Sequence, residues 1–201
     1  MDAEEFRRHG HALVDWLADH MAGLAQRRVQ PETLPGGVKV LLPAHPPEAP
    51  ERFEAVLADL DRVVAPNLTW WQHPRFFGFF PANALAAGVL GDLASTGLGV
   101  LGLSWQASPA LTEVEEVTVD WMRQALGLSD QWFGAIQDTA SGATLVALIA
   151  ARERASGYAM QAGGLQGGCA RLVVYASEGA HSSVAKAALL AGFGRDNLRL
   201  I

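Results

Sequence analysis

The chain has 201 residues, and half of them are apolar, which is enough for a hydrophobic core. Its formal net charge of −6 at pH 7 argues against nucleic acid or an anionic membrane surface as a partner. The single cysteine, Cys169, excludes a disulfide framework within the chain, and no run of about 18 apolar residues indicates a membrane span. We therefore expect a globular protein in a reducing, cytoplasmic setting.

The first 65 residues predict two amphipathic helices joined by an extended connection. Apolar stripes at helical spacing run over residues 6–24 and 53–64, and Pro66 ends the second. Six prolines and two glycines between positions 30 and 50 forbid a continuous helix there. Two helices joined in this way bury little against each other, so we expect their stripes to pack on another surface, such as a second subunit.

The rest of the chain predicts alternating helices and strands. A helix is expected over residues 83–95, and a second begins at Ser108-Pro109, with serine as N-cap, and ends at Gly127. A helix follows the sequence DTASG and is apolar almost all round over residues 143–151, so we expect it to be buried.

Three short apolar runs predict strands near residues 134–137, 171–176 and 198–201, and a helix that opens at the serine-histidine segment separates the last two. This order is typical of a parallel α/β sheet covered on both faces. Three strands do not complete such a sheet. We therefore expect the chain to be the front part of something larger.

The glycines of GLGVLG, residues 97–102, match the spacing of a dinucleotide-binding loop. That mechanism requires a strand before the loop and a helix directly after it, so that a pyrophosphate meets the helix N-terminus. Here a helix precedes the glycines and an extended segment follows them. We interpret them as a tight crossing of chain segments.

The segment DTASGATL, residues 138–145, places hydroxyl residues and a glycine at a helix start. Free backbone amides there can bind a phosphate, although Thr139 or Ser141 could equally be a simple helix cap. Ligands of open α/β sheets bind beyond the carboxyl ends of strands, and this favours the phosphate site.

His181 follows a predicted strand on the same edge of the sheet as this phosphate site. A lone histidine is more often structural, but an imidazole at this edge could stack on a planar ring. Lys186 is interpreted as a solvated helix residue that points away from the face of the histidine.

Six aromatic residues between positions 70 and 80 are interpreted mainly as core or interface packing, with one or two lining an apolar pocket. The acidic residues of the helix over 108–126 form a solvated face rather than a catalytic pair. The histidines near the N-terminus are not at metal-ligand spacing, and we expect no metal site.

Four motifs together resemble the pyridoxal-phosphate-dependent group II amino-acid decarboxylases, nearest the aromatic-L-amino-acid decarboxylases. In order and spacing they are HPRFFGFFPANA, GLGVLGLSWQASPALTEVEEVTVDWM, DTASGATLVALIAAR and SEGAHSSVAKAALLAG. The resemblance covers essentially the whole chain. It implies the α/β type I fold of pyridoxal-phosphate enzymes, with an N-terminal helical arm that forms a homodimer (residues 1–82) and the first part of the cofactor-binding large domain (residues 83–201).

The resemblance also implies roles for individual residues. Ala140 and Ser141 would hold the phosphate of pyridoxal 5'-phosphate, and His181 would stack on its ring and act in catalysis. The side chain of the substrate would be bordered by five residues, some of them reaching it from the partner subunit: Trp71, Phe80, Ala82, Leu101 and Leu103.

The chain departs from the family pattern at several positions. Position 82, often threonine or serine in the family, is alanine here, and position 103, often aromatic in the animal enzymes, is leucine. Asp138 stands where glycine is expected, so its charge disfavours a nearby phosphate unless it points away. The lysine that forms a Schiff base with the cofactor is preceded by histidine in the family, and neither Lys39 nor Lys186 has that context. We therefore expect this chain alone to be catalytically inactive.

The resulting hypothesis is the N-terminal portion of an L-amino-acid decarboxylase, a carboxy-lyase of amino-acid metabolism that acts on aromatic substrates and releases an amine and CO2. One alternative keeps the fold and cofactor but changes the substrate or gives an aldehyde. Another is a non-enzymatic module for dimerisation or cofactor binding.

Overall fold

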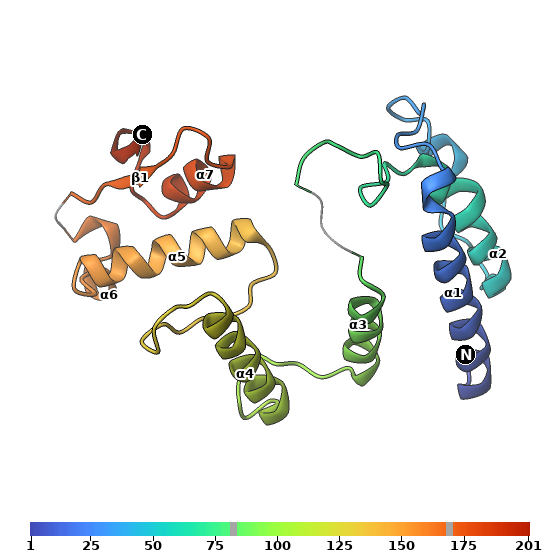
Figure 1. Ribbon diagram of the computed structural model, residues 1–201, viewed down its shortest axis with the longest axis horizontal. Coiled ribbons are helices and arrows are strands. Elements are labelled where there is room, and N and C mark those ends of the chain that lie inside the picture. Colours follow the sequence, from blue (N-terminus) through green and yellow to red (C-terminus); the bar gives the residue numbers. More distant parts are fainter. Residues whose placement is uncertain (81–83, 168–170) are drawn as a thin grey trace. The chain divides into compact units, whose positions relative to one another are not determined.

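The computed structural model describes residues 1–80, 84–167 and 171–201, so Ala82 and Cys169 lie outside the described residues. The chain forms two compact units, Met1–Gly99 and Val100–Ile201 (Figure 1). The division into functional domains at residue 82 stays a prediction. No helix of the described ranges is both long and apolar enough to cross a membrane.

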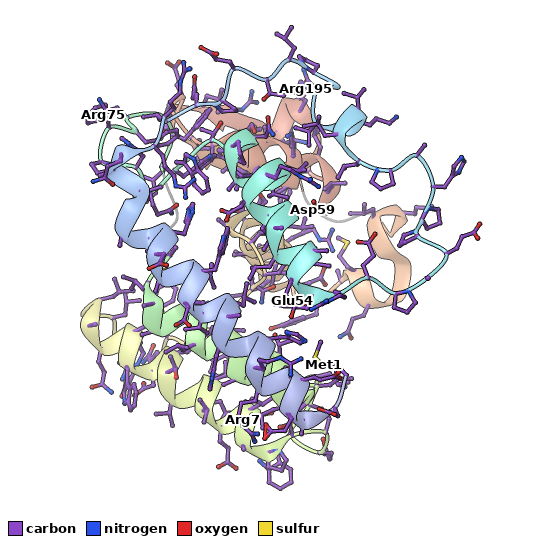
Figure 2. The ribbon with its side chains drawn as sticks, turned by 90° about the vertical axis from the view of Figure 1, so that its right-hand side faces the viewer. Met1, Arg7, Glu54, Asp59, Arg75 and Arg195 are labelled. Atoms are coloured by element: carbon purple, nitrogen blue, oxygen red, sulfur yellow. The ribbon has the colours of Figure 1, made fainter. Side chains whose placement is uncertain are left out.

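The first unit is helical. It contains α1 (Ala3–Gly23), α2 (Phe53–Asp59) and α3 (Ala86–Leu98), and α2 continues through a π-helical turn, η3 (Leu60–Val64), into the 3-10 turn η4 (Ala65–Asn67). Helices α1 and α2 lie side by side (Figures 1 and 2), where the His9 and Phe53 rings are 4.5 Å apart. The connection between them contains the short 3-10 turns η1 (Leu24–Gln26) and η2 (Lys39–Leu41), so the prediction of an interrupted connection is confirmed.

Aromatic rings hold the C-terminal end of α1 to the segment after η4. The His20 ring lies 5.4 Å from Trp16 and 4.4 Å from Trp70, measured between centroids, and the Arg27 guanidinium lies 5.6 Å from the Trp70 ring. The backbone N–H of Trp70 donates to the carbonyl of Val29 at 2.9 Å. These contacts fix the start of the aromatic segment that follows residue 70.

The second unit combines helices with a small parallel sheet. Its helices are α4 (Pro109–Ala125), α5 (Ala140–Ala155), α6 (Met160–Gly163) and α7 (Ser182–Leu190), with 3-10 turns η5 (Gly164–Gln166) and η6 (Arg195–Asn197). Strand β1 (Val174–Ala176) pairs in parallel with β2 (Leu198–Leu200), as the sequence predicted, in the register Tyr175 to Arg199. The predicted cap of α4 is also confirmed, because the Ser108 side chain accepts from the Leu111 N–H.

Two predictions for this unit are wrong in the described structure. Residues 134–137 form no strand, because the Ile136 N–H donates to the Glu115 carboxylate of α4 at 2.8 Å instead of entering a sheet. Helix α5 is not buried: none of its residues is fully covered, since α7 is the main element packed against it among the described residues. In the first unit, α3 begins at Ala86, and its predicted start at residue 83 lies outside the described residues.

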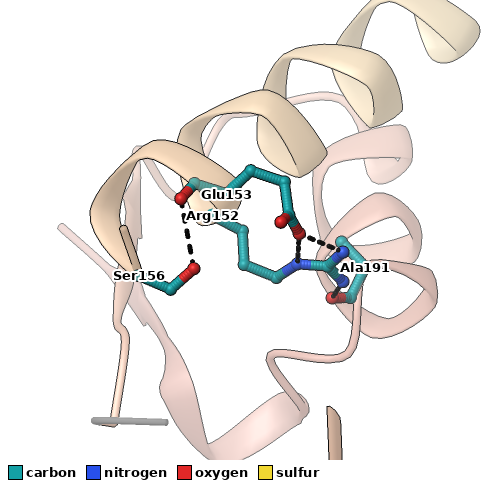
Figure 3. A network of polar contacts seen from close by, with 4 residues as sticks. All are labelled: Arg152, Glu153, Ser156 and Ala191. Carbon is teal, nitrogen blue, oxygen red and sulfur yellow. Dashed lines mark hydrogen bonds and ion pairs between the residues drawn. The ribbon is translucent and has the colours of Figure 1, made fainter. Parts of the chain in front are cut away.

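A polar network ties α5 to the end of α7 (Figure 3). The Arg152 guanidinium donates to the Ala191 carbonyl at 2.6 Å and to the Glu153 carboxylate at 2.8 and 3.1 Å. The Ser156 hydroxyl donates to the Glu153 carbonyl at 3.1 Å. Because Ala191 is the C-cap of α7, this network sets the position of α7 along α5.

The histidine of the aromatic contact should make stability depend on pH. Burial lowers the pKa of His20 below its usual value near 6.5, Arg27 lowers it further, and Asp61 partly opposes the shift. The unfolded chain therefore binds the proton more readily, so the free energy of unfolding should fall as the pH falls below about 6.5, down to the folded pKa. Urea unfolding followed by tryptophan fluorescence between pH 5.5 and 7.5 measures this.

The matched variants are His20→Phe, which keeps a ring but cannot titrate, and His45→Phe in the exposed connection. The first should flatten the dependence and the second should leave it unchanged. A slope that survives in His20→Phe would assign the effect to another group.

Candidate functional site

The N-terminal turn of α5 carries free backbone donors. Thr139 is the N-cap, and its hydroxyl accepts from the Gly142 N–H at 3.0 Å. The N–H groups of Ala140 and Ser141 and the Ser141 hydroxyl have no hydrogen-bond partner among the described residues. The structure thus assigns the cap to Thr139, one of the two residues that the sequence left open, and leaves two amides available for an anion.

Asp138 does not point away from this turn. Its Oδ1 accepts from the Thr139 N–H at 2.9 Å and lies 2.7 Å from the place that a Cβ on Gly142 would occupy. A side chain at position 142 would require this carboxylate to move. The negative charge therefore lies at the same helix end as the free amides and opposes an incoming phosphate.

His181 is the N-cap of α7, five residues after β1. Its Nδ1 accepts from the Ser183 N–H at 3.2 Å and lies 3.0 Å from the Ser183 hydroxyl. Because Nδ1 accepts a backbone hydrogen bond, the neutral ring carries its proton on Nε2. The residue thus has a structural role as a cap while its ring stays exposed.

The two helix ends share one pocket of about 270 Å³. Ser141, Gly142 and Leu145 line it from α5, and His181, Ser183, Lys186, Ala187 and Leu190 line it from α7. The two segments that the sequence placed on one edge of the sheet thus line one pocket, although residues 134–137 form no strand before α5. Their role as a phosphate site and a stacking histidine stays a prediction. Lys186 is exposed as expected, but the prediction that it points away from the histidine is wrong, because both residues line this pocket.

The predicted substrate-side residues are divided between the two units. Trp71 stacks on Phe76 and Phe79, with centroids 5.5 and 5.4 Å apart, and Phe80, on the same loop, is 97% exposed. Leu101 and Leu103 begin the second unit and are also exposed, whereas Ala82 lies outside the described residues. Sequence reasoning overlooked His73 in this loop, although Pro74 directly after it favours an extended or turn conformation at this position.

A pocket at a helix N-terminus with free amides, lined by hydroxyls, an imidazole and a lysine, suits a ligand that joins an anionic group to a flat ring. The amides and the Ser141 hydroxyl can donate to the anion, and the exposed face of His181 can stack on the ring. The arrangement offers binding and orientation.

Comparison with known proteins gives a consistent result. The family described as the pyridoxal-dependent decarboxylase conserved domain matches residues 35–201. The aromatic-L-amino-acid decarboxylase of Bos taurus is 42% identical over 207 residues, which cover 96% of this chain and 42% of that protein. The phenylacetaldehyde synthase of Arabidopsis thaliana is 39% identical and is matched by 100% of this chain over 41% of its own length.

Among solved structures, the tryptophan decarboxylase of Catharanthus roseus in complex with L-tryptophan has a TM-score of 0.88 and 35% identity. The match covers 100% of this chain and 44% of that one. The chain thus spans about two fifths of the length of the relatives that it matches.

The capping role of His181 can be separated from any role of its ring. His181→Ala removes the acceptor of the Ser183 N–H and should lower the free energy of unfolding by about 1 kcal/mol. His181→Asn keeps an acceptor at the same place and should cost only a few tenths of a kcal/mol. Urea denaturation followed by circular dichroism compares them, and equal stability of the alanine variant and the wild type would contradict the capping role.

Proposed function

The chain belongs to the pyridoxal-dependent decarboxylase family, and on this premise we propose that it supplies the phosphate-binding and ring-stacking part of an L-amino-acid decarboxylase acting on aromatic substrates. The likeness to tryptophan decarboxylase structures confirms the predicted α/β fold class, that of type I pyridoxal-phosphate enzymes. The observation that carries the proposal is the single pocket that joins the free N-terminus of α5 to His181.

The residues of this pocket, together with Ala140 directly before Ser141 at the start of α5, fit pyridoxal 5'-phosphate. The free amides of Ala140 and Ser141 would hold the phosphate, and the exposed ring of His181 would stack on the pyridine. When bound, the cofactor supplies an electron sink for the charge left by loss of CO2. In this arrangement the hydrogen bond from Ser183 fixes the plane of the imidazole, so the histidine can orient the ring and the substrate beside it.

The substrate side of the proposal rests on the aromatic loop and the similar proteins. As the resemblance implies, an aromatic side chain would be bordered by five residues, some of them reaching it from the partner subunit: Trp71, Phe80, Ala82, Leu101 and Leu103. One relative that carries the name tryptophan decarboxylase was solved with L-tryptophan, and another, from Oryza sativa, with tryptamine. Release of an aldehyde instead of an amine is a second candidate, because phenylacetaldehyde synthase is 39% identical to this chain.

A homodimer, in a cytoplasmic setting, is part of the same proposal. A hollow of about 700 Å³ in the first unit is lined mainly by apolar side chains of α1 and α3, with Phe53. Several of these, among them Phe6, Leu90 and Leu93, are exposed in the single chain. Apolar side chains that are exposed together in this way favour burial against a second copy.

The charge at the N-terminus of α5 gives a direct test of the phosphate site. Ser141→Asp adds a negative charge and should weaken binding about tenfold or more, whereas Asp138→Asn removes one and should tighten binding severalfold. Isothermal titration with pyridoxamine 5'-phosphate, which lacks the aldehyde and cannot react with lysines, measures both. Thr118→Asp, on α4, adds the same charge away from the pocket and serves as control.

His181→Asn, which keeps the helix cap, should also weaken binding through loss of ring contact. Affinities that do not change in Ser141→Asp or Asp138→Asn would place the phosphate elsewhere.

The position of Lys186 makes a second test necessary. We propose that neither Lys39 nor Lys186 anchors the cofactor covalently, so this chain alone does not decarboxylate amino acids. Borohydride reduction with pyridoxal phosphate, followed by peptide mass spectrometry, should give no stoichiometric adduct at either lysine. A stoichiometric adduct at Lys186, together with amine production from an aromatic amino acid, would contradict the proposal.

A further inference from the structure

His73 is one of the few fully covered side chains of the first unit, only 3% exposed, and it lies inside the aromatic loop. It begins a tight turn, because the Phe76 N–H donates to the His73 carbonyl at 2.9 Å and Pro74 occupies the second position. Proline at this position presets the backbone for such a turn. The His73 N–H in turn donates to the Trp70 carbonyl at 3.1 Å, which joins the turn to the anchored start of the loop.

The imidazole closes the turn from inside. The Arg75 N–H donates to His73 Nδ1 at 3.0 Å, so a backbone donor within the turn is satisfied by the side chain two residues earlier. Asn and Asp make the same contact in turns of this type. Because Nδ1 accepts, the neutral ring carries its proton on Nε2, which is buried and has no partner among the described residues.

The turn determines where the aromatic side chains lie. Trp71 precedes it and Phe76 ends it, and both rings belong to the same stack as Phe79. Phe79 has φ of 51°, a left-handed conformation that a bulky residue adopts only when its surroundings hold it there. Phe80 directly follows and is turned out to solvent. The exposed position of Phe80 thus depends on the stack, and the stack depends on the turn.

We propose that His73 is a positioning residue for the substrate-binding loop. It acts through Nδ1, by holding the Arg75 amide, and thereby fixes Trp71 and Phe80 in the arrangement that receives an aromatic side chain. The substrate part of this inference rests on the proposed function, whereas the ordering of the loop does not.

Two conservative variants distinguish the contribution of Nδ1 from that of Nε2. His73→Asn places an oxygen where Nδ1 lies and can accept from the Arg75 N–H, whereas His73→Gln places its polar end near Nε2 and loses that bond. His45→Gln makes the same change at an exposed position of the connection and serves as control. If His73 only filled space, the glutamine and asparagine variants would not differ in this way. An ordered loop in His73→Asn but not in His73→Gln therefore indicates the Nδ1 contact.

Limited digestion of the 201-residue chain with trypsin measures how well the loop is ordered, because trypsin cleaves after Arg75 only when the turn opens. The initial rate of appearance of the peptide beginning at Phe76 should rise about tenfold in His73→Gln and stay within about twofold of wild type in His73→Asn and His45→Gln. Cleavage after Arg62, which lies in η3 of the same unit, should stay unchanged and shows that the first unit has not unfolded.

A rate in His73→Gln equal to wild type would overturn the positioning role. So would a rise in His73→Asn as large as that in His73→Gln, because the Nδ1 contact would then be irrelevant.

Binding of an aromatic amine connects the loop with substrate. In saturation-transfer NMR with phenethylamine, the signal from the aromatic protons should fall at least about threefold in His73→Gln and be kept in His73→Asn. Equal signals in the two variants would overturn the substrate part of the inference. If the wild-type chain binds no phenethylamine at all, the proposed function fails at this loop, while the tryptic rates still decide the positioning role.

Discussion

The packing of α7 along α5 is the constraint on which the candidate site depends. Each helix supplies only part of the site: α5 offers two free amides and a hydroxyl, and α7 offers His181, the residue that caps its N-terminus. Arg152 fixes their relative position, because one guanidinium bonds both the Glu153 carboxylate and the carbonyl at the end of α7. The hydrogen bond from Arg152 to Ala191 lies at the opposite end of α7 from His181. The nine-residue helix therefore links the position of Ala191 to that of His181 in the pocket.

The first unit is organised by aromatic contacts rather than by a large apolar core. Only Val63 and Ala65 are fully buried apolar residues among its described positions, and His20, Trp16 and Trp70 form the contact between α1 and the aromatic loop. Flat rings can pack on one another while one face stays exposed. This explains how a unit with so little buried apolar surface can still define the course of a loop.

The sequence predicted those features that depend on local physics. The Ser108 cap, the end of α4 at Gly127, the interrupted connection after α1 and the parallel pairing of β1 and β2 all follow from residue type and order. The turn at His73 could also have been predicted from the local sequence, because Pro74 follows the histidine directly. The interpretation of this segment as an aromatic run left the histidine out.

Features that depend on neighbours distant in sequence could not be predicted in this way. Residues 134–137 have strand composition, yet the Glu115 side chain takes the backbone N–H that a sheet would need. Helix α5 has the composition of a buried helix but lies largely uncovered, because burial depends on what packs against it. Lys186 enters the pocket because the cap places His181 outside the helix, a detail that helical spacing alone does not give.

The carboxylate of Asp138 changes how the proposed site must hold its cofactor. A helix N-terminus attracts anions through its unpaired amides, and here Asp138 already uses the Thr139 N–H and adds a negative charge beside the two that remain. The attraction for a phosphate is therefore weaker than at an uncharged helix end. More of the binding energy must come from contacts to the ring, and His181 is the flat side chain of this pocket that can make them. The packing of α7 on α5 therefore determines both the geometry of the proposed site and its affinity for the cofactor, because it places His181 beside the free amides of α5.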